Sequence, residues 1–202
     1  MINLILRSDK MEKFSMPEQV SATLEIDETT RLKKSLEATI SKEEADRIMS
    51  ELSLPVNSTP GARAEWVDKL SGLLESRFDE KTIKAIRQKC HCNENGRLEN
   101  TAKSLKELYI SSNKDLHKFV NALNENGAGW YIEDNQLYTK MFLCECPMLE
   151  KAENTSSLTW CYCTAGYSKK LFEIVFETAV DVEIIHTIRQ GFDFCLLRIS
   201  FK

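Results

Sequence analysis

Apolar residues in the first 127 positions recur every three or four residues, which is the spacing of an amphipathic α-helix. This spacing predicts a helix over residues 28–40. Ser41 followed by Glu44 is a capping box and predicts the start of a second helix, because the hydroxyl accepts from a free backbone amide and the carboxylate reaches back. Pro55 disfavours helical geometry in the residue before it, so this helix should stop near Leu54.

Four more helices are expected before residue 127. Thr59 ahead of Pro60 combines a capping side chain with a proline at the first helical position, which predicts a helix start. The other three helices should begin at Asp79, near Leu98 and at Asn113, and the last of them should end at Gly127.

After Gly129 the pattern changes to shorter runs that are rich in aromatic and β-branched residues, which is typical of strands. Strands are expected over Trp130–Ile132, Gln136–Cys144, Leu158–Tyr162, Asp181–Ile188 and Phe192–Phe201, with one amphipathic helix over Ser168–Thr178. The last two strands should be joined by a tight turn that ends at Gly191.

These elements predict an α+β fold, in which an N-terminal helical region precedes an antiparallel sheet with one packed helix, in the order β-β-β-α-β-β. Residues 1–16 are expected to be a disordered leader, because Met11 or Met16 could also start the chain. Residues 17–127 form the helical region and 128–202 the α+β domain. The sequence leaves open whether these are two domains or one compact unit.

The composition narrows the classes of partner. The 202 residues carry a net charge of −4, so the chain lacks the basic excess that is typical of nucleic-acid-binding proteins. No apolar run is long enough to span a membrane. Seven cysteines without an export signal indicate a cytoplasmic protein, whose cysteines would be free thiols, metal ligands or redox groups. The sequence leaves the oligomeric state open, a homodimer included.

Six of the cysteines form three Cys-x-Cys pairs. Cys161 and Cys163 are the best candidates for chemistry, because they directly precede a predicted helix whose free amides stabilise a thiolate. Gly166 would allow a tight turn from strand to helix. The alternative is two small apolar cysteines in the core.

Cys144 and Cys146 lie at the end of a predicted strand, before Pro147, and would share a strand face with Tyr138 and Phe142. Metal binding or redox chemistry and simple packing are equally compatible with this pair. Two Cys-x-Cys pairs together can supply the four thiolates of a tetrahedral zinc site.

Cys90 lies on the apolar stripe of its helix and is expected to pack in the core. Cys92 and His91 follow in a loop from which they could reach a metal. Cys195 and His186 each lie on an apolar strand face, where a packed core residue is the simpler interpretation. His186 is one hairpin away from Cys195, however, and could be a fourth ligand.

The run Cys161-x-Cys163-x-x-Gly166-Tyr167, a following helix and a late Cys195 together resemble the 4-vinyl-reductase-like domain family. The strand-turn-strand ending is also similar to the aminothiazoline-carboxylate hydrolases, and the helical half looks like prokaryotic relatives of both families. The resemblance implies a compact α+β domain that binds small hydrophobic or aromatic molecules and a metal. By position it implies Cys161, Cys163 and Cys195 as ligands, with a fourth from Cys144, Cys146 or His186, although a cysteine is expected where His186 stands.

The leading hypothesis is therefore a metal-binding sensor or small-molecule-binding domain that holds zinc, with an iron–sulfur cluster as the alternative cofactor. The candidate metal ligands are Cys92, Cys144, Cys146, Cys161, Cys163, Cys195 and His186. The small molecule would occupy an apolar pocket lined by Trp130, Phe142, Trp160, Tyr167 and Phe172. A second hypothesis is a small hydrolase or redox enzyme in which Cys163 is a low-pKa nucleophile and His186 the base. A third is that every cysteine belongs to the core and no cofactor is bound.

Overall fold

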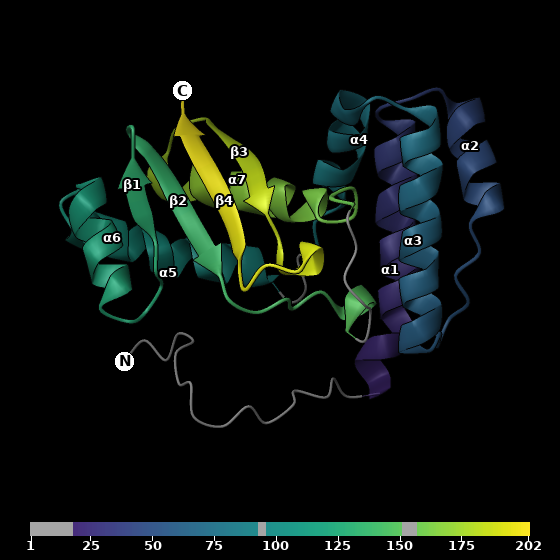
Figure 1. The fold of residues 1–202 in the computed structure, drawn as a ribbon, viewed down its shortest axis with the longest axis horizontal. Helices are drawn as coiled ribbons and strands as arrows, with labels where there is room; N and C mark the ends of the chain where they lie inside the picture. The colour runs from purple at the N-terminus through teal and green to yellow at the C-terminus, as the bar shows by residue number, and fades with distance from the viewer. Residues whose placement is uncertain (1–17, 93–95, 151–156) are drawn as a thin grey trace.

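The structure is a computed structural model, which describes residues 18–92, 96–150 and 157–202, with side chains from Asp27 onward. The expected leader, residues 1–16, lies outside these ranges. The architecture is α+β, as the sequence predicted, with a group of N-terminal helices beside a four-stranded antiparallel sheet (Figure 1). No helix of the described residues is long and apolar enough to cross a membrane.

The first helices pack as a bundle at the right of Figure 1. They are α1 (Glu18–Glu37), α2 (Lys42–Glu51), α3 (Pro60–Arg77) and α4 (Glu80–Arg87), and a 3₁₀ turn, η1 (Gln88–Cys90), follows α4. The predicted cap residues are confirmed: Ser41, Thr59 and Asp79 each accept a hydrogen bond from the backbone amide three residues on. The Glu44 carboxylate, which was expected to complete a capping box with Ser41, pairs with Arg47 and Arg77 instead. Leu32, Ile48, Leu70 and Ile86 are fully buried between these helices.

The next two helices, α5 (Arg97–Ser111) and α6 (Leu116–Asn124), lie with the sheet rather than with the bundle (Figure 1). The cap of α6 is Asp115, which accepts from the amide of Lys118 at 3.0 Å. The expectation that Asn113 caps this helix was wrong. Asn113 and Lys114 both have a left-handed backbone, with φ values of 59° and 56°, and form the turn before the cap.

The sheet has the strand order β1-β2-β4-β3, and every neighbouring pair is antiparallel. Its strands are β1 (Tyr131–Glu133), β2 (Gln136–Met141), β3 (Val180–His186) and β4 (Cys195–Phe201). Helix α7 (Tyr162–Phe176) packs on one face, where Phe172 and Val175 meet the buried face of the sheet, which includes Leu137, Leu197 and Ile199.

The strand expected over Leu158–Tyr162 does not exist, so the order after the helices is β-β-α-β-β. Residues 159–161 form a turn, and α7 begins at Tyr162, six residues earlier than expected. Leu158, Trp160 and Tyr162 alternate as a half-buried strand would. Trp160 and Tyr162 are instead buried by contacts with the bundle.

Strand β2 also ends earlier than expected, at Met141. Cys144 and Cys146 therefore lie in an irregular segment before a 3₁₀ turn, η3 (Pro147–Leu149), and do not share a strand face with Tyr138 and Phe142. Leaving the strand frees this segment to bend away from the sheet.

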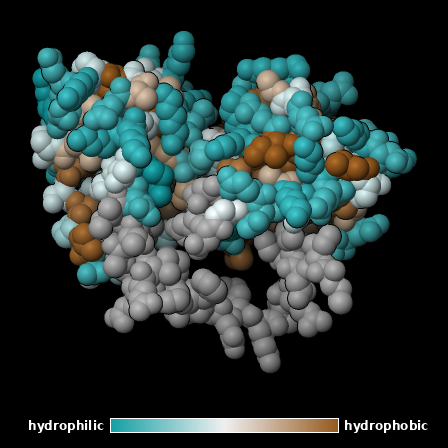
Figure 2. Space-filling view, turned by 180° about the vertical axis from the view of Figure 1, so that it is seen from behind, coloured by the Kyte–Doolittle hydropathy of each residue, from teal (hydrophilic) through white to brown (hydrophobic). Residues whose placement is uncertain are grey.

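Gly166 was expected at a strand-to-helix turn but lies inside α7. A Cβ atom at this position would lie 1.9 Å from the carbonyl oxygen of Gln88. Helix α7 thus crosses η1 at a distance that only glycine permits, and this crossing joins the sheet to the end of the bundle. The surface on the rear of the molecule is mostly hydrophilic, over the helical bundle as well as over the part that contains the sheet. Hydrophobic side chains form small separate patches on it (Figure 2).

Candidate metal centre

Cysteines from three separate segments meet around one turn, η4 (Ile188–Gln190), which connects β3 to β4. The β2–β4 register pairs Met141 with Cys195, so the chain that leaves β2 with Cys144 runs beside the start of β4. The turn is fixed by a capping box between Thr187 and Gln190, and by Gly191 with a φ of 91°.

Three of these sulfurs interact with consecutive residues of the turn region. The Thr187 side chain hydrogen-bonds to the Cys161 thiol. The Ile188 amide donates to Cys195 Sγ at 3.3 Å, and Arg189 Nε donates to Cys144 Sγ at 3.2 Å. Arg189 also donates to the carbonyl of Leu149, which holds η4 against η3.

A fourth sulfur, that of Cys146, has its hydrogen-bond donors outside the turn η4. The indole Nε1 of Trp160 donates to Cys146 Sγ at 3.3 Å, and the backbone amide of Met148 donates to the same sulfur. Cys161 is the residue directly before the first turn of α7, so the start of that helix places its thiol. We call Cys144, Cys146, Cys161 and Cys195 the four-thiol cluster.

Electrostatic interactions link these thiols to one another, and they also link Cys146 and Cys161 to Cys163. Burial, with smaller contributions from Cys144, Cys146 and Cys195, raises the pKa of Cys161 to about 12. Burial and Cys144 raise the pKa of Cys146 to about 11, although the Trp160 hydrogen bond opposes the shift. Burial also raises the pKa of Cys195. The thiols of Cys146, Cys161 and Cys195 are therefore neutral near pH 7, because burial makes their thiolate forms unfavourable.

The donor chemistry of the cluster suits a soft metal ion, because its four ligand atoms are sulfurs and each has a hydrogen-bond donor of its own. The geometry is not that of a closed site. Within the described residues, no three histidine, cysteine, aspartate or glutamate side chains are arranged to hold a metal ion. All seven cysteines are free thiols.

Cys163 does not have the character of a nucleophile. It lies in the first turn of α7 near the buried Arg87. Burial nevertheless raises the pKa of its thiol well above the usual range, and the positive guanidinium only partly offsets this. The low pKa expected at the helix start is therefore not found, because desolvation outweighs the helix dipole.

His186 and Cys92 lie in other surroundings. His186 stacks on Phe192, with ring centroids 4.2 Å apart, and contacts Phe194 at 5.0 Å. Burial and Lys140 lower its pKa. Cys92 is exposed and interacts electrostatically with Arg31 and Arg97. The structure therefore places neither residue among the contacts that define the four-thiol cluster.

Cys90 and His91 also lie apart from that set of contacts. Cys90 is buried in the core, as expected, and hydrogen-bonds to the carbonyl of Ile86. His91 meets the ring of Tyr167 edge-on at 6.4 Å, and burial lowers its pKa.

Comparison with known proteins gives a family but no activity. Residues 21–202 match the model of a family described as a family of unknown function, DUF6144. The chain belongs to this family. No curated protein and no solved structure matches it. Nothing in these comparisons links this DUF6144 chain to the 4-vinyl-reductase-like domains or to the aminothiazoline-carboxylate hydrolases, so that resemblance stays a prediction.

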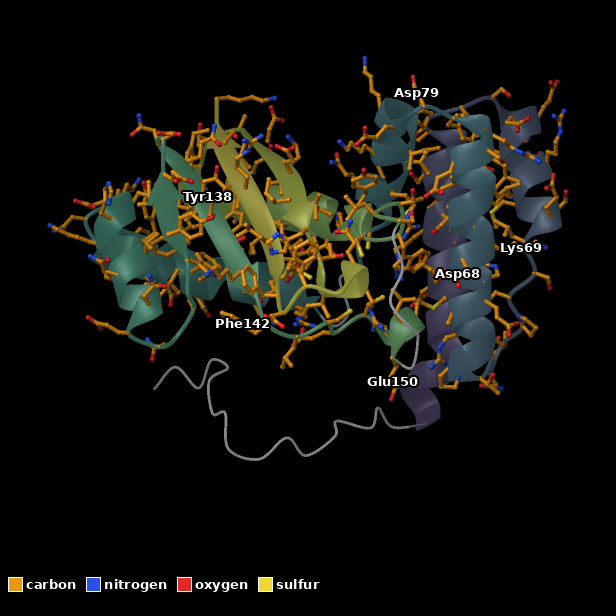
Figure 3. All side chains as sticks on the ribbon, in the orientation of Figure 1. Asp68, Lys69, Asp79, Tyr138, Phe142 and Glu150 are labelled. Carbon is orange, nitrogen blue, oxygen red and sulfur yellow. The ribbon has the colours of Figure 1, made fainter. Side chains whose placement is uncertain are left out.

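The five aromatic residues expected to line one apolar pocket are dispersed in this DUF6144 chain. Trp130 packs on Phe172 in the core under the sheet, with ring centroids 5.8 Å apart. Phe142 lies just beyond β2 and is half-exposed (Figure 3). Trp160 is buried against the bundle, and Tyr167 contacts His91. None of the five lines either of the two open pockets beside α4.

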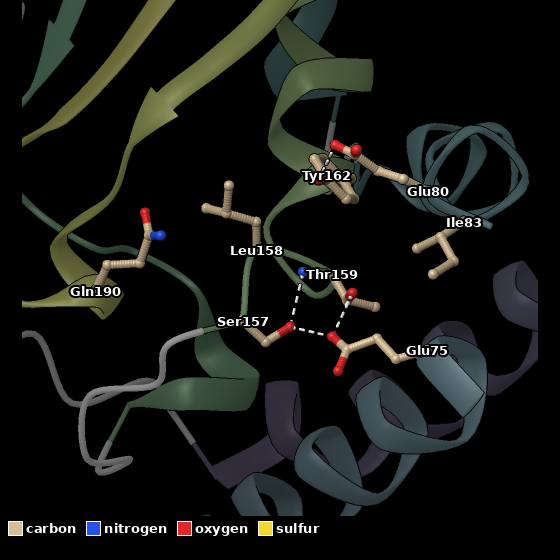
Figure 4. Close-up of a pocket in the computed structure, with 8 residues that line it drawn as sticks. All are labelled: Glu75, Glu80, Ile83, Ser157, Leu158, Thr159, Tyr162 and Gln190. Carbon is tan, nitrogen blue, oxygen red and sulfur yellow. Dashed lines mark hydrogen bonds between the residues drawn. The ribbon is translucent and has the colours of Figure 1, made fainter. Parts of the chain in front are cut away.

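An open pocket of about 440 Å³ lies instead between α3, α4 and the segment before α7 (Figure 4). Glu75 accepts hydrogen bonds from Ser157 and Thr159, and Glu80 accepts from Tyr162 at 3.0 Å. These polar groups hydrogen-bond to one another, so the pocket lies along a polar contact between the bundle and the start of α7.

Arg87 is a residue of the site region that the sequence analysis missed. Its side chain is fully buried, and its guanidinium lies over the Trp160 ring at 4.0 Å. The helical repeat contained the signal, because Arg87 follows Ile83 by four residues and precedes Cys90 by three on the apolar stripe. A cation on such a stripe indicates a buried charge with a specific partner.

Proposed function

We propose that this protein binds one zinc ion through Cys144, Cys146, Cys161 and Cys195, in a site that stabilises or regulates the fold. The observation that supports the proposal is that cysteines from three segments contact the turn at Thr187–Arg189 or the neighbouring Trp160, each with its own hydrogen-bond donor. Such donors orient thiolate ligands and offset their charge in metal sites.

Zinc fits this donor set because it accepts four thiolates in a tetrahedron without redox chemistry. A divalent cation would also remove the repulsion that four neighbouring thiolates would otherwise suffer. Metal binding would require the four thiols to come closer together than they lie in the structure, because no three ligand side chains among the described residues are arranged to hold an ion. Free thiols of this kind belong to a reducing, cytoplasmic setting.

A zinc ion with four protein ligands has no open position for a substrate, so the site would be structural or sensory rather than catalytic. The raised pKa of Cys163 gives no support to the nucleophile hypothesis. An iron–sulfur cluster uses the same ligands, and the test separates it from zinc by colour and sulfide content.

The test is metal analysis of protein purified without oxygen, for the wild type and two single variants. Wild-type protein is expected to contain about one zinc per chain, as a single four-thiolate site holds. Cys146→Ser should lose most of it, because serine oxygen is a poor ligand for this soft site. Cys92→Ser is the matched control and should retain the metal.

A cobalt titration provides a second readout, since cobalt in a tetrahedral thiolate site absorbs visible light and zinc does not. Wild type and Cys92→Ser should give the same spectrum, and Cys146→Ser should not. Zinc-free wild type that also fails to take up cobalt would refute the proposal. Brown protein that contains iron and sulfide would show that the site holds an iron–sulfur cluster instead of zinc.

A further inference from the structure

Strand β3 (Val180–His186) lies at the edge of the sheet, on the side of the helical bundle (Figure 1). Among the described residues its one neighbouring strand is β4, so one side of its backbone has no ladder. Such an edge presents N–H and C=O groups that can pair with another extended chain. Natural proteins often keep edge strands short, as in β1 with three residues, but β3 has seven.

The register shows which residues of β3 point their backbone groups away from β4. Lys202 donates its amide to the carbonyl of Ala179 at 3.1 Å, so these two residues form a hydrogen-bonded pair. Bonded and non-bonded pairs alternate along an antiparallel ladder, so the odd-numbered residues of β3 bond to β4. Val182 and Ile184 therefore direct their amides and carbonyls outward, and we call these groups the free edge.

Both ends of the free edge are limited by the structure. Lys169 Nζ donates to the carbonyl of Val180, the first outward carbonyl of the strand, at 2.5 Å. A β-bulge after Ile184 interrupts the register at the other end. Among the residues that the structure describes, none hydrogen-bonds to the outward groups of Val182 and Ile184. A short extended segment could therefore pair with them.

The side chains of β3 restrict what can pair with the free edge. Asp181 and Glu183 point to the solvent face of the sheet, where their side chains are 62% and 50% exposed. They pair with Lys202 and Arg198, but ion pairs this exposed contribute little. On the other face, Val182 is only partly buried against the core. A second copy of β3 would place acidic residues opposite each other, which is destabilising, whereas a strand with basic residues at alternate positions would complement them.

We infer that the free edge of β3 binds an extended segment of a partner protein that has lysine or arginine at alternate positions and apolar residues between them. The segment adds a strand beside β3, with its backbone bonded to Val182 and Ile184 and its basic side chains next to Asp181 and Glu183. Its apolar side chains extend the sheet face that packs on α7. None of the cysteines takes part, so this inference is independent of the proposed zinc site.

The charge preference is tested with two fluorescein-labelled peptides as long as β3. One alternates lysine and valine, and the control has glutamate in place of lysine. Fluorescence anisotropy with the full chain should show about tenfold tighter binding of the lysine peptide, because cross-strand charge pairs replace repulsions. Glu183→Lys should abolish this preference. Asp68→Lys, the same change on the exposed side of α3, is the matched control and should keep it (Figure 3).

The backbone pairing is tested by amide hydrogen exchange, followed by NMR. The lysine peptide should slow exchange at Val182 and Ile184 and leave Glu183, which already bonds to β4, unchanged. Val182→Pro removes one outward N–H without removing a bond to β4, so it should weaken peptide binding about tenfold. If this variant fails to fold, the exchange measurement on wild type still decides.

Equal affinity of the two peptides would overturn the inferred partner chemistry. Bound lysine peptide without slower exchange at Val182 and Ile184 would overturn pairing at the free edge. Slow exchange of these two amides in the protein alone, together with a dimer by light scattering, would show that a second copy occupies the edge, and would overturn the inference as well.

Discussion

Gly166 lies in the middle of α7, where the helix touches the backbone of another element. The nearest atoms to a methyl group added at this position would be the carbonyl oxygen, carbonyl carbon and Cα of Gln88, at 1.9, 2.6 and 2.7 Å. These are backbone atoms and cannot rotate away as a side chain could. The position therefore depends on the absence of a side chain and not on glycine flexibility.

Gly166→Ala is expected to destabilise the protein by at least about 3 kcal/mol, the upper range for overpacking a core. Gly72→Ala is the matched control, because Gly72 is also inside a helix but has no atom within 4 Å of a Cβ. That control should gain up to about 1 kcal/mol from higher helix propensity. Urea unfolding followed by circular dichroism measures both changes. Equal stability of the two variants would show that α7 and η1 are not in this contact.

The sequence predicted the burial of single residues correctly where burial follows from residues nearby in the chain. Cys90 was expected in the core and is buried there. Arg87 was missed, although it lies on the same stripe, because its partners Glu28 and Trp160 are 59 and 73 residues away in the chain. A periodic pattern shows which face is buried but not which distant residue pairs with it.

At the scale of elements, helix starts were the most predictable features, because a cap acts over three residues. Ser41, Thr59 and Asp79 all cap as the sequence indicated. The cap of α6 was expected at Asn113 but is Asp115. Asn113 adopts a left-handed backbone in the turn before the helix, so Asp115 occupies the capping position.

Asp115→Ala is expected to lower the unfolding temperature by a few degrees, while Asp115→Asn, which can still cap, should change it less. The amides of Lys118 and His117 hold the pKa of the Asp115 carboxyl below its usual range. Its contribution is therefore present above the unfolded pKa, near 3.9, and disappears as the pH falls through the lower folded value.

Thermal scans from pH 7 to pH 2.5 should show the gap between wild type and Asp115→Ala narrowing at the acid end. Asn113→Gly serves as the control, because glycine suits the positive φ and no cap is removed. A larger loss in Asn113→Gly than in Asp115→Ala would mean that Asn113 is the cap after all.

The absent strand at Leu158–Tyr162 shows where element prediction stops. Alternation of apolar residues normally indicates a strand with one buried face. Here Trp160 is buried by Trp66 and Arg87 from the bundle, and the Tyr162 hydroxyl bonds to Glu80 of α4. These partners come from the first half of the chain, so no local pattern could reveal them.

Across the whole molecule, the cysteine arrangement depends on topology. The sequence identified Cys144, Cys146, Cys161 and Cys195 as candidates but also included Cys163, Cys92 and His186. The strand order β1-β2-β4-β3 explains part of the arrangement, because it brings the chain after β2, which carries Cys144, to the start of β4 at Cys195 and both to the turn after β3. Strand order is a property of long-range pairing and cannot be derived from the spacing of cysteines.

If zinc binds at this junction, its removal should destabilise the bundle and the sheet together, since the cluster touches both through Trp160 and η4. A ligand that binds only the folded state stabilises it by about 4 kcal/mol when its free concentration is a thousand times its Kd. A strong chelator should therefore lower the unfolding temperature of wild type and Cys92→Ser by several degrees. It should leave Cys146→Ser, which has already lost the site, unchanged. Hydrogen exchange would locate the effect, with faster exchange expected in α4 as well as in α7 after chelation. Faster exchange confined to α7 and the strands would mean that the stability of the bundle does not depend on the metal.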